Sequence, residues 1–188
     1  MTSNDLPEDP SLTVATSAGM FALWSPEPFA GIHDYDTWED ELLEDDDIER
    51  HIRAAALVPI NIRSDGAFGF VLRAGIIAQP ATLTDREARY LTVSSQPYRL
   101  QCQDRACISG IEHIEAQPSE GWAHAIALAA GQYDVTIHLL DWKAEPDTET
   151  ADGTPIDGAL PDFVVLINPS TEDQSAYRTN VQTFDQPA

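Results

Sequence analysis

The sequence predicts a mainly β protein of the α+β class, an antiparallel β-sandwich or curled barrel with one acidic helix near residues 36–56. Three observations support this class. About eight short apolar or β-branched segments are separated by turn signals. One segment has apolar residues at helical spacing. The chain does not alternate strand-like and helix-like segments, which argues against a doubly wound parallel sheet.

The chain begins with polar, acidic residues and two prolines, so residues 1–10 are expected to form a disordered tail. A length of 188 residues fits one domain. We place this domain at residues 11–170, followed by a weakly determined C-terminal tail at 171–188. Residues 12–16 and 20–24 are apolar or β-branched and flank Ser17-Ala18-Gly19, which predicts a first hairpin.

Residues 36–56 carry the helical pattern, with apolar side chains at positions 38, 42 and 43 and again at 48, 52 and 55. Asp36 or Thr37 is expected to cap the start, and acids in the first turn suit the helix dipole. The segment forms either one helix or two helices divided at the aspartates 45–47, one of which then caps the second helix. In both versions most carboxylates lie away from the apolar stripe.

The next segments predict strands. Residues 57–63 and 67–73 flank Asp65-Gly66, which favours a type I′ turn, and so predict a second hairpin in which Ile60 faces Val71. Residues 84–87 have the spacing of a capping box, but β-branched residues follow at once, so at most one helical turn is expected. Residues 91–103 and 106–114 predict another pair of strands.

The C-terminal half contains the two strongest strand patterns. Residues 131–142 alternate along the chain and predict a long strand, and residues 163–167 predict a buried one. Between them, residues 143–160 have no apolar period, and a loop of that length is expected to be mobile or functional. The side chains expected in the core from these two strands are Tyr133, Val135, Ile137, Leu139, Val164 and Leu166.

Charge is the unusual property of this sequence. Its 32 acidic residues against 10 basic ones give a net charge of −22. Such a chain is a poor candidate for binding nucleic acid through phosphates or for docking on an anionic membrane. Ten carboxylates lie in the stretch 34–49, whereas residues 50–105 contain eight arginines. The acidic stretch is either a solubilising face partly neutralised by the chain's own arginines or a docking surface for a basic partner.

Motifs for common chemistry are absent from the sequence. It contains no phosphate-binding, dinucleotide-binding, nucleophile-elbow or zinc-protease signature, and its five histidines are scattered. We therefore expect no catalytic residues, no metal site and no cofactor. A signal peptide and an apolar spanning segment are also absent, so a cytoplasmic protein is expected. Cys102 and Cys107 would oppose each other across a turn at 104–105, and we expect them to stay reduced.

The segments GQYDVTIHLLDW and LPDFVVLINP, together with the size and acidity, resemble small bacterial proteins found near type VI or contact-dependent secretion toxins. The resemblance covers roughly residues 57–168. In these features the chain is similar to toxin-neutralising immunity proteins, particularly those that inhibit nucleases. It implies tight binding to one cognate effector that is rich in lysine and arginine, and it assigns no residue roles.

Two functions remain open from the sequence. The first is a non-catalytic immunity protein, a monomer or weak dimer, that inhibits a basic toxin such as a nuclease. The alternative is a β-sandwich ligand-binding module or hydrolase with a mobile 143–160 loop. For the first function the expected partner-binding residues are Asp34, Asp36, Trp38, Glu39, Asp40, Glu41, Glu44, Asp45, Asp46, Asp47 and Glu49. A secondary partner-binding surface is expected at Glu145, Asp147, Glu149, Asp152 and Asp157.

Overall fold

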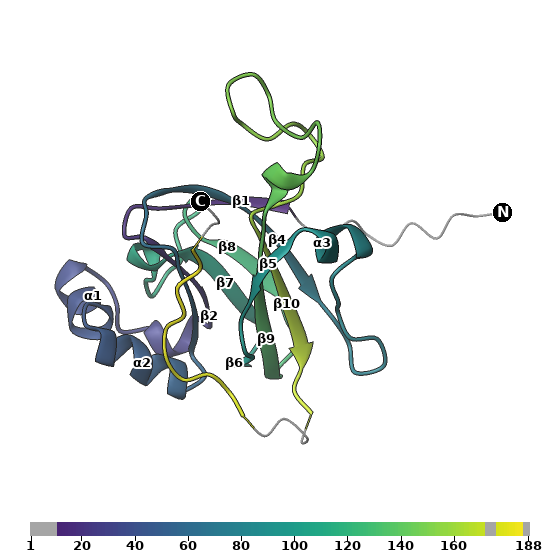
Figure 1. The fold of residues 1–188 in the computed structure, drawn as a ribbon. Coiled ribbons are helices and arrows are strands. Elements are labelled where there is room, and N and C mark those ends of the chain that lie inside the picture. The colour runs from purple at the N-terminus through teal and green to yellow at the C-terminus, as the bar shows by residue number, and fades with distance from the viewer. Residues whose placement is uncertain (1–10, 172–175, 186–188) are drawn as a thin grey trace.

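The computed structural model describes residues 11–171 and 176–185, which form two β-sheets packed face to face with three short helices beside them (Figure 1). The prediction of a mainly β sandwich is confirmed, and the sheets do not close into a barrel. The disordered tail predicted at residues 1–10 lies outside the described residues.

The larger sheet has six strands. Its path runs β1, β4, β10, β9 and β5, and β6 pairs with β9 on the same side as β5. The pair of β10 and β4 is parallel, and the other pairs are antiparallel. The strand bounds are β1 Ser11–Thr16, β4 Gly66–Ala74, β10 Phe163–Pro169, β9 Gly131–Leu140, β5 Leu91–Ser94 and β6 Tyr98–Cys102.

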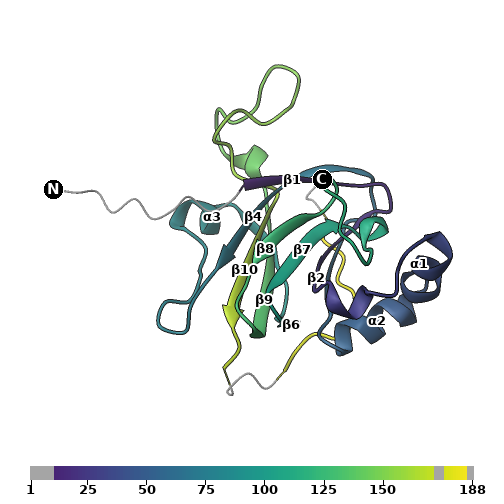
Figure 2. The ribbon, with the colours of Figure 1, turned by 180° about the vertical axis from the view of Figure 1, so that it is seen from behind.

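The smaller sheet has four antiparallel strands in the order β3, β2, β7 and β8. Seen from behind, β7 and β8 lie in front of β9 and β10, so the two sheets form separate layers (Figure 2). The strand bounds are β3 Leu57–Asn61, β2 Met20–Trp24, β7 Arg105–Gly110 and β8 His124–Ala127.

The predicted hairpins are wrong, although their strands exist. β1 and β2 lie in different sheets, and so do β3 and β4, and β6 and β7. In each case the chain crosses from one layer to the other, because strands that are apolar on the inner face bury more surface against the opposite sheet. The turn at Asp65-Gly66 is also not type I′, which requires positive φ at both central residues, since only Gly66 has it.

The core lies between the sheets. Phe21 of β2 packs edge-on against Phe70 of β4, with ring centroids 5.0 Å apart, and Phe70 stacks on Phe163 of β10 at 5.1 Å. The predicted core positions on β9 are confirmed, because Tyr133, Val135, Ile137 and Leu139 are all buried there. Val164 and Leu166 are buried as well, in a second apolar cluster on the outer face of β10.

The acidic segment forms two helices, α1 (Tyr35–Leu42) and α2 (Asp45–Arg53). The expected caps are wrong. Asp34 caps α1 by accepting from the Thr37 amide at 2.9 Å, and the N-cap of α2 is Glu44, which makes no side-chain capping bond. A third helix, α3 (Asp85–Arg89), begins at the predicted capping box of Thr84 and Glu87, which is confirmed.

Three single turns of 3-10 helix complete the elements, at η1 (Glu27–Phe29), η2 (Ile111–His113) and η3 (Trp142–Ala144). The segment 176–185 crosses one open side of the sandwich. The Arg178 amide donates to Pro97 O, the Phe184 amide donates to Asn61 O, and the Phe184 ring is buried in the core. None of the helices in the described part of the chain is long and apolar enough to cross a membrane.

The two cysteines are buried as free thiols, and burial raises the pKa of Cys107 to about 11. They are not opposed across a hairpin as predicted, because β6 and β7 belong to different sheets. The 143–160 segment is a loop that protrudes from the sandwich beyond η3 (Figure 1).

Candidate protein-docking surface

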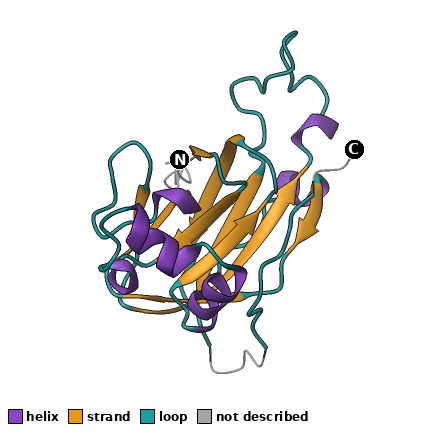
Figure 3. Cartoon of the chain, turned by 90° about the vertical axis from the view of Figure 1, so that its left-hand side faces the viewer, coloured by secondary structure: helices purple, strands orange, loops and turns teal. Residues whose placement is uncertain are grey.

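Helices α1 and α2 form a helical hairpin on one side of the sandwich, away from the 143–160 loop (Figure 3). The apolar face of the hairpin is buried through Leu42, Ile48 and Ile52, which join the core. The hairpin is therefore fixed to the body by ordinary hydrophobic packing. Its carboxylates project from the remaining surface.

The ten carboxylates of residues 34–49 fall into three groups. Asp34 caps α1, and the Thr37 backbone and side-chain hydrogen bonds lower the pKa of its carboxyl. Three others pair with arginines of α2, namely Glu41 and Asp47 with Arg50 and Glu49 with Arg53. The six that pair with no cation among the described residues are Asp36, Glu39, Asp40, Glu44, Asp45 and Asp46.

Glu41 has a structural role within the hairpin. Its Oε2 accepts from Arg50 Nη2 at 3.2 Å and lies 2.9 Å from His51 Nε2. The His51 ring is buried and packs 4.7 Å from the ring of Phe29. Burial lowers the pKa of His51, and the hydrogen bond to Glu41 offsets part of that shift. Glu41 thus joins α1 to α2 and is not free for a partner.

Trp38 forms a hydrogen bond between α1 and the body of the protein. It is half-buried, and its indole Nε1 donates to Ile111 O at 2.9 Å, which ties α1 to η2. The ring also stacks on Tyr35, with centroids 6.0 Å apart. Tyr35 is exposed over 65% of its surface. Trp38 therefore packs α1 against the body and at the same time borders the exposed surface.

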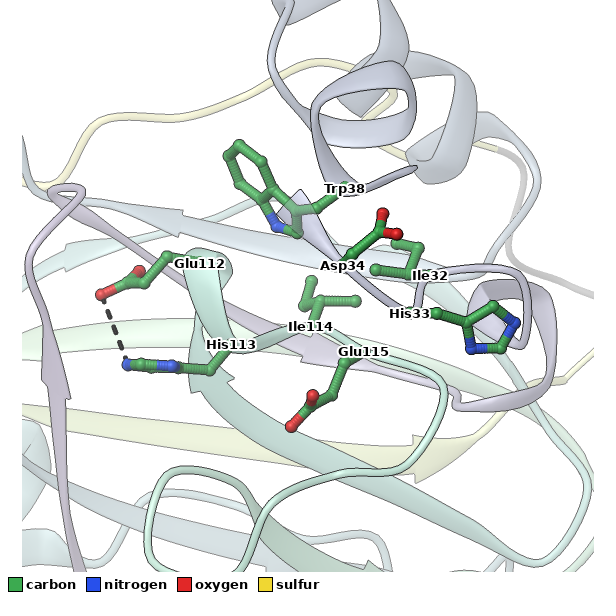
Figure 4. Close-up of a pocket in the computed structure, with 8 residues that line it drawn as sticks. All are labelled: Ile32, His33, Asp34, Trp38, Glu112, His113, Ile114 and Glu115. Carbon is green, nitrogen blue, oxygen red and sulfur yellow. Dashed lines mark ion pairs between the residues drawn. The ribbon is translucent and has the colours of Figure 1, made fainter. Parts of the chain in front are cut away.

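A shallow cavity of about 140 Å³ lies beside the start of α1 (Figure 4). Glu112 accepts from Thr16 Oγ1 and from the Ser17 amide and hydroxyl, and Glu115 accepts from the Ser119 amide. These carboxylates are therefore already used by neighbouring loops. In the described ranges of the chain, no group of histidines, cysteines and acids could hold a metal ion. The cavity is lined by Ile32, His33, Asp34, Trp38, Glu112, His113, Ile114 and Glu115.

The acids of the 143–160 loop form a separate surface. Glu145 makes a two-bond ion pair with Arg86 at 2.6 and 2.8 Å, and that pair lowers the pKa of Glu145. Glu149 lies 3.9 Å from Lys143 Nζ. The remaining three, Asp147, Asp152 and Asp157, are exposed and have no cationic partner in the described part of the chain.

One side-chain pair outside these surfaces resembles hydrolytic machinery. Ser94 Oγ lies 2.8 Å from His138 Nδ1, across the pairing of β5 with β9. The other ring nitrogen lies 3.3 Å from Thr136 Oγ1, where a triad would place a carboxylate. Among the residues that the structure describes, no carboxylate forms a hydrogen bond with the His138 ring to orient it. Sequence reasoning missed it because only the strand register brings the two residues together.

No protein-family model and no curated protein matches the sequence. Two solved structures are similar to the chain. The first, "Crocagin biosynthetic gene J", has a TM-score of 0.57 at 17% identity, over 87% of this chain and 98% of that one. The second is ComJ from Bacillus subtilis, titled an inhibitor of the DNA degrading activity of NucA, with a TM-score of 0.48 at 10% identity over 86% and 96%. At this identity the first likeness shows a shared fold and no more.

Proposed function

We propose that this protein is a non-catalytic inhibitor of the immunity type, which binds a basic protein such as a nuclease toxin through the α1–α2 hairpin. One observation carries the proposal. Six carboxylates of the hairpin have no cation among the described residues, although the hairpin is already attached to the body by its apolar face. These charges repel one another, and a cation-rich partner surface is a physical reason to retain them.

The high negative charge suits rapid association with a toxic enzyme. Oppositely charged proteins associate at up to about 10⁸–10⁹ M⁻¹s⁻¹ at low salt, against about 10⁵–10⁶ M⁻¹s⁻¹ without steering. An enzyme that acts on nucleic acid presents cations where its polyanionic substrate binds. A surface of carboxylates can occupy that site in place of phosphates. ComJ inhibits a nuclease by its title, but a TM-score of 0.48 is too low for that likeness to support the proposal, which depends on the hairpin alone.

The proposal is tested with two variants that change the net charge equally at different places. The hairpin variant carries lysine at 39, 40, 44 and 45, and the loop variant carries lysine at 147, 149, 152 and 157. Wild-type protein immobilised in a lysate of its own source should enrich a basic protein, and the hairpin variant should lose it. Added wild-type protein should then inhibit the nuclease activity of the purified partner.

The loop variant shows whether partner binding depends on the position of the acids or only on the net charge of the protein. If it captures the partner as wild type does, the hairpin is the docking surface. If both variants lose the partner equally, only net charge matters and the assignment to the hairpin is wrong. Loss with the loop variant alone would place the contact on the 143–160 loop. If wild-type protein enriches no basic protein over either variant, the inhibitor proposal itself is wrong.

A second candidate function, a ligand-binding module, is favoured by one cavity. It has a volume of about 310 Å³ and lies at the base of the 143–160 loop, between Trp142, Lys143 and Leu160 on one side and Thr13 and Gly69 on the other. That volume is at the lower limit for small-molecule sites. A rise in melting temperature with a small molecule, lost on substitution of Lys143→Ala, would support this function over the inhibitor proposal.

A further inference from the structure

Four aromatic rings form two separate stacks beside the hairpin. Tyr35 stacks on Trp38, with centroids 6.0 Å apart, and His113 stacks on Trp122 at 4.6 Å. Trp38 and His113 both line the cavity of about 140 Å³, and Figure 4 shows Trp38 above Glu112 and His113 below it. The two stacks therefore flank one shallow depression. Each stack has an exposed outer member, with Tyr35 65% and Trp122 54% exposed.

The chain holds these rings in place. Trp38 is fixed by its indole hydrogen bond to Ile111 O. Trp122 follows Gly121, whose φ of +90° lets the chain turn tightly, and the Trp122 amide donates to Ser119 O at 3.2 Å. Ser119 is in turn held by Glu115, which accepts from its amide at 3.1 Å. Exposed rings that are held in position lose little conformational entropy on binding, which is the property of interface anchors.

We propose that these two stacks bind arginine side chains of the basic partner, an inference that rests on the function proposed above. A guanidinium is planar and weakly hydrated, and it stacks on aromatic faces while its N–H groups donate to carboxylates at the edge. Here the carboxylates of Asp34, Glu112 and Glu115 border the cavity between the stacks. Each already accepts hydrogen bonds from its own chain, and an ionised carboxylate has about four acceptor sites, so each can still accept from a guanidinium. A lysine ammonium is a compact, strongly hydrated charge and does not stack in this way.

Charge complementarity selects this occupant over others. Tyr35 and Trp38 belong to α1, so they share a helix with the unpaired acids Asp36, Glu39 and Asp40. A second copy of the chain also carries a net charge of −22 and would be repelled. A small apolar ligand would find only about 140 Å³ of polar-edged space. The acids therefore raise the association rate of a basic partner, and the rings bind its arginine side chains.

The test uses two synthetic hexapeptides, one with three arginines alternating with glycine and one with lysines in the same positions. Binding at low ionic strength and pH 8 is measured by titration calorimetry and by NMR of the tryptophan indole N–H groups. The arginine peptide should bind more tightly, by roughly fivefold for each stack it engages. The signals of Trp38 and Trp122 should shift, while those of the buried Trp24 and Trp142 stay in place.

Variants show which side chains cause the preference for the arginine peptide over the lysine peptide. The double variant Tyr35→Ala/Trp122→Ala should bind both peptides equally weakly. A matched control, Ile76→Ala/Ile77→Ala, removes two exposed apolar side chains elsewhere and should keep the wild-type preference. Trp122→Phe should retain part of it. All of these side chains are exposed, so the variants should fold.

The outcomes separate this inference from the function on which it rests. Equal binding of both peptides, weakened by the hairpin variant but not by Tyr35→Ala/Trp122→Ala, would overturn the arginine site and leave the charge-based docking intact. Arginine preference that survives in the double variant would also overturn it. If neither peptide binds at low ionic strength, the arginine site and the docking function both fail.

Discussion

Reversing the charge of the hairpin should leave the protein as stable as wild type. The substitutions are Glu39→Lys, Asp40→Lys, Glu44→Lys and Asp45→Lys, chosen because none of these acids pairs with a cation among the described residues. Glu41, Asp47 and Glu49 are left unchanged because they pair with Arg50 and Arg53. This prediction underlies the proposed function, since acids that serve the fold would need no partner to explain them.

The size of the expected change in the free energy of unfolding follows from the spacing of the acids along the helices. In α1, Asp36 repels Glu39 and Asp40 at spacings of three and four, and in α2, Asp45 repels Glu49 at a spacing of four. Each such pair costs about 0.2–0.5 kcal/mol and contributes a similar gain when one charge is reversed. Three pairs thus give a gain of about 1–3 kcal/mol. Against this, Lys at position 45 opposes the dipole of α2, which costs about 1–2 kcal/mol.

The net change in the free energy of unfolding is therefore expected to lie between a loss of about 1 kcal/mol and a gain of about 2 kcal/mol. Urea unfolding, followed by tryptophan fluorescence at low and high salt, measures it. Wild type should gain more stability from salt than the variant, because screening relieves its repulsion. A loss of more than about 2 kcal/mol in the variant would show that the carboxylates support the fold, and the argument for an external partner would then fail.

Two further predictions concern the body of the protein. Ile137→Ala should lower the free energy of unfolding by about 2–5 kcal/mol, because Ile137 is fully buried in the middle of β9. The control is Thr136→Ala at the neighbouring position. A loss of less than about 0.5 kcal/mol for Ile137→Ala would show that the core face of β9 is misassigned. Glu87→Gln should cost about 3 kcal/mol, because it breaks a buried ion pair whose bonds to Arg73 are both 2.9 Å. Burial raises the pKa of Glu87, but hydrogen bonds from Arg73 and Thr84 outweigh it and the net pKa lies below its usual 4.5. The pair therefore stabilises the fold above about pH 4.5 and loses that contribution as the pH falls through the folded pKa, so acid unfolding curves of Glu87→Gln should be flatter than wild type in that range.

Part of the candidate site could be predicted from the sequence. The run of carboxylates at 34–49 is visible in the composition, and its helical spacing places most of them away from the apolar stripe. Which of them are unpaired could not be predicted. That depends on how α2 folds back on α1, which brings Arg50 and His51 to Glu41 across ten residues of chain or fewer. The arrangement of the aromatic stacks was missed because only the tertiary fold places Trp122 against His113 and His113 at the same cavity as Trp38.

Local patterns in the sequence by themselves determined the mainly β class, the buried face of β9, the strand β10 and the capping box of α3. Each of these depends on interactions within a few residues or on the alternation of side chains along one strand. Only the tertiary structure decided which strands pair. A turn signal marks where the chain changes direction. The strand after the turn can then pair with the strand before it or cross to the opposite sheet, and the conformational free energy of the turn residues is similar in the two cases. The choice follows from burial of apolar faces between two layers, which involves residues as distant as Phe21, Phe70 and Phe163.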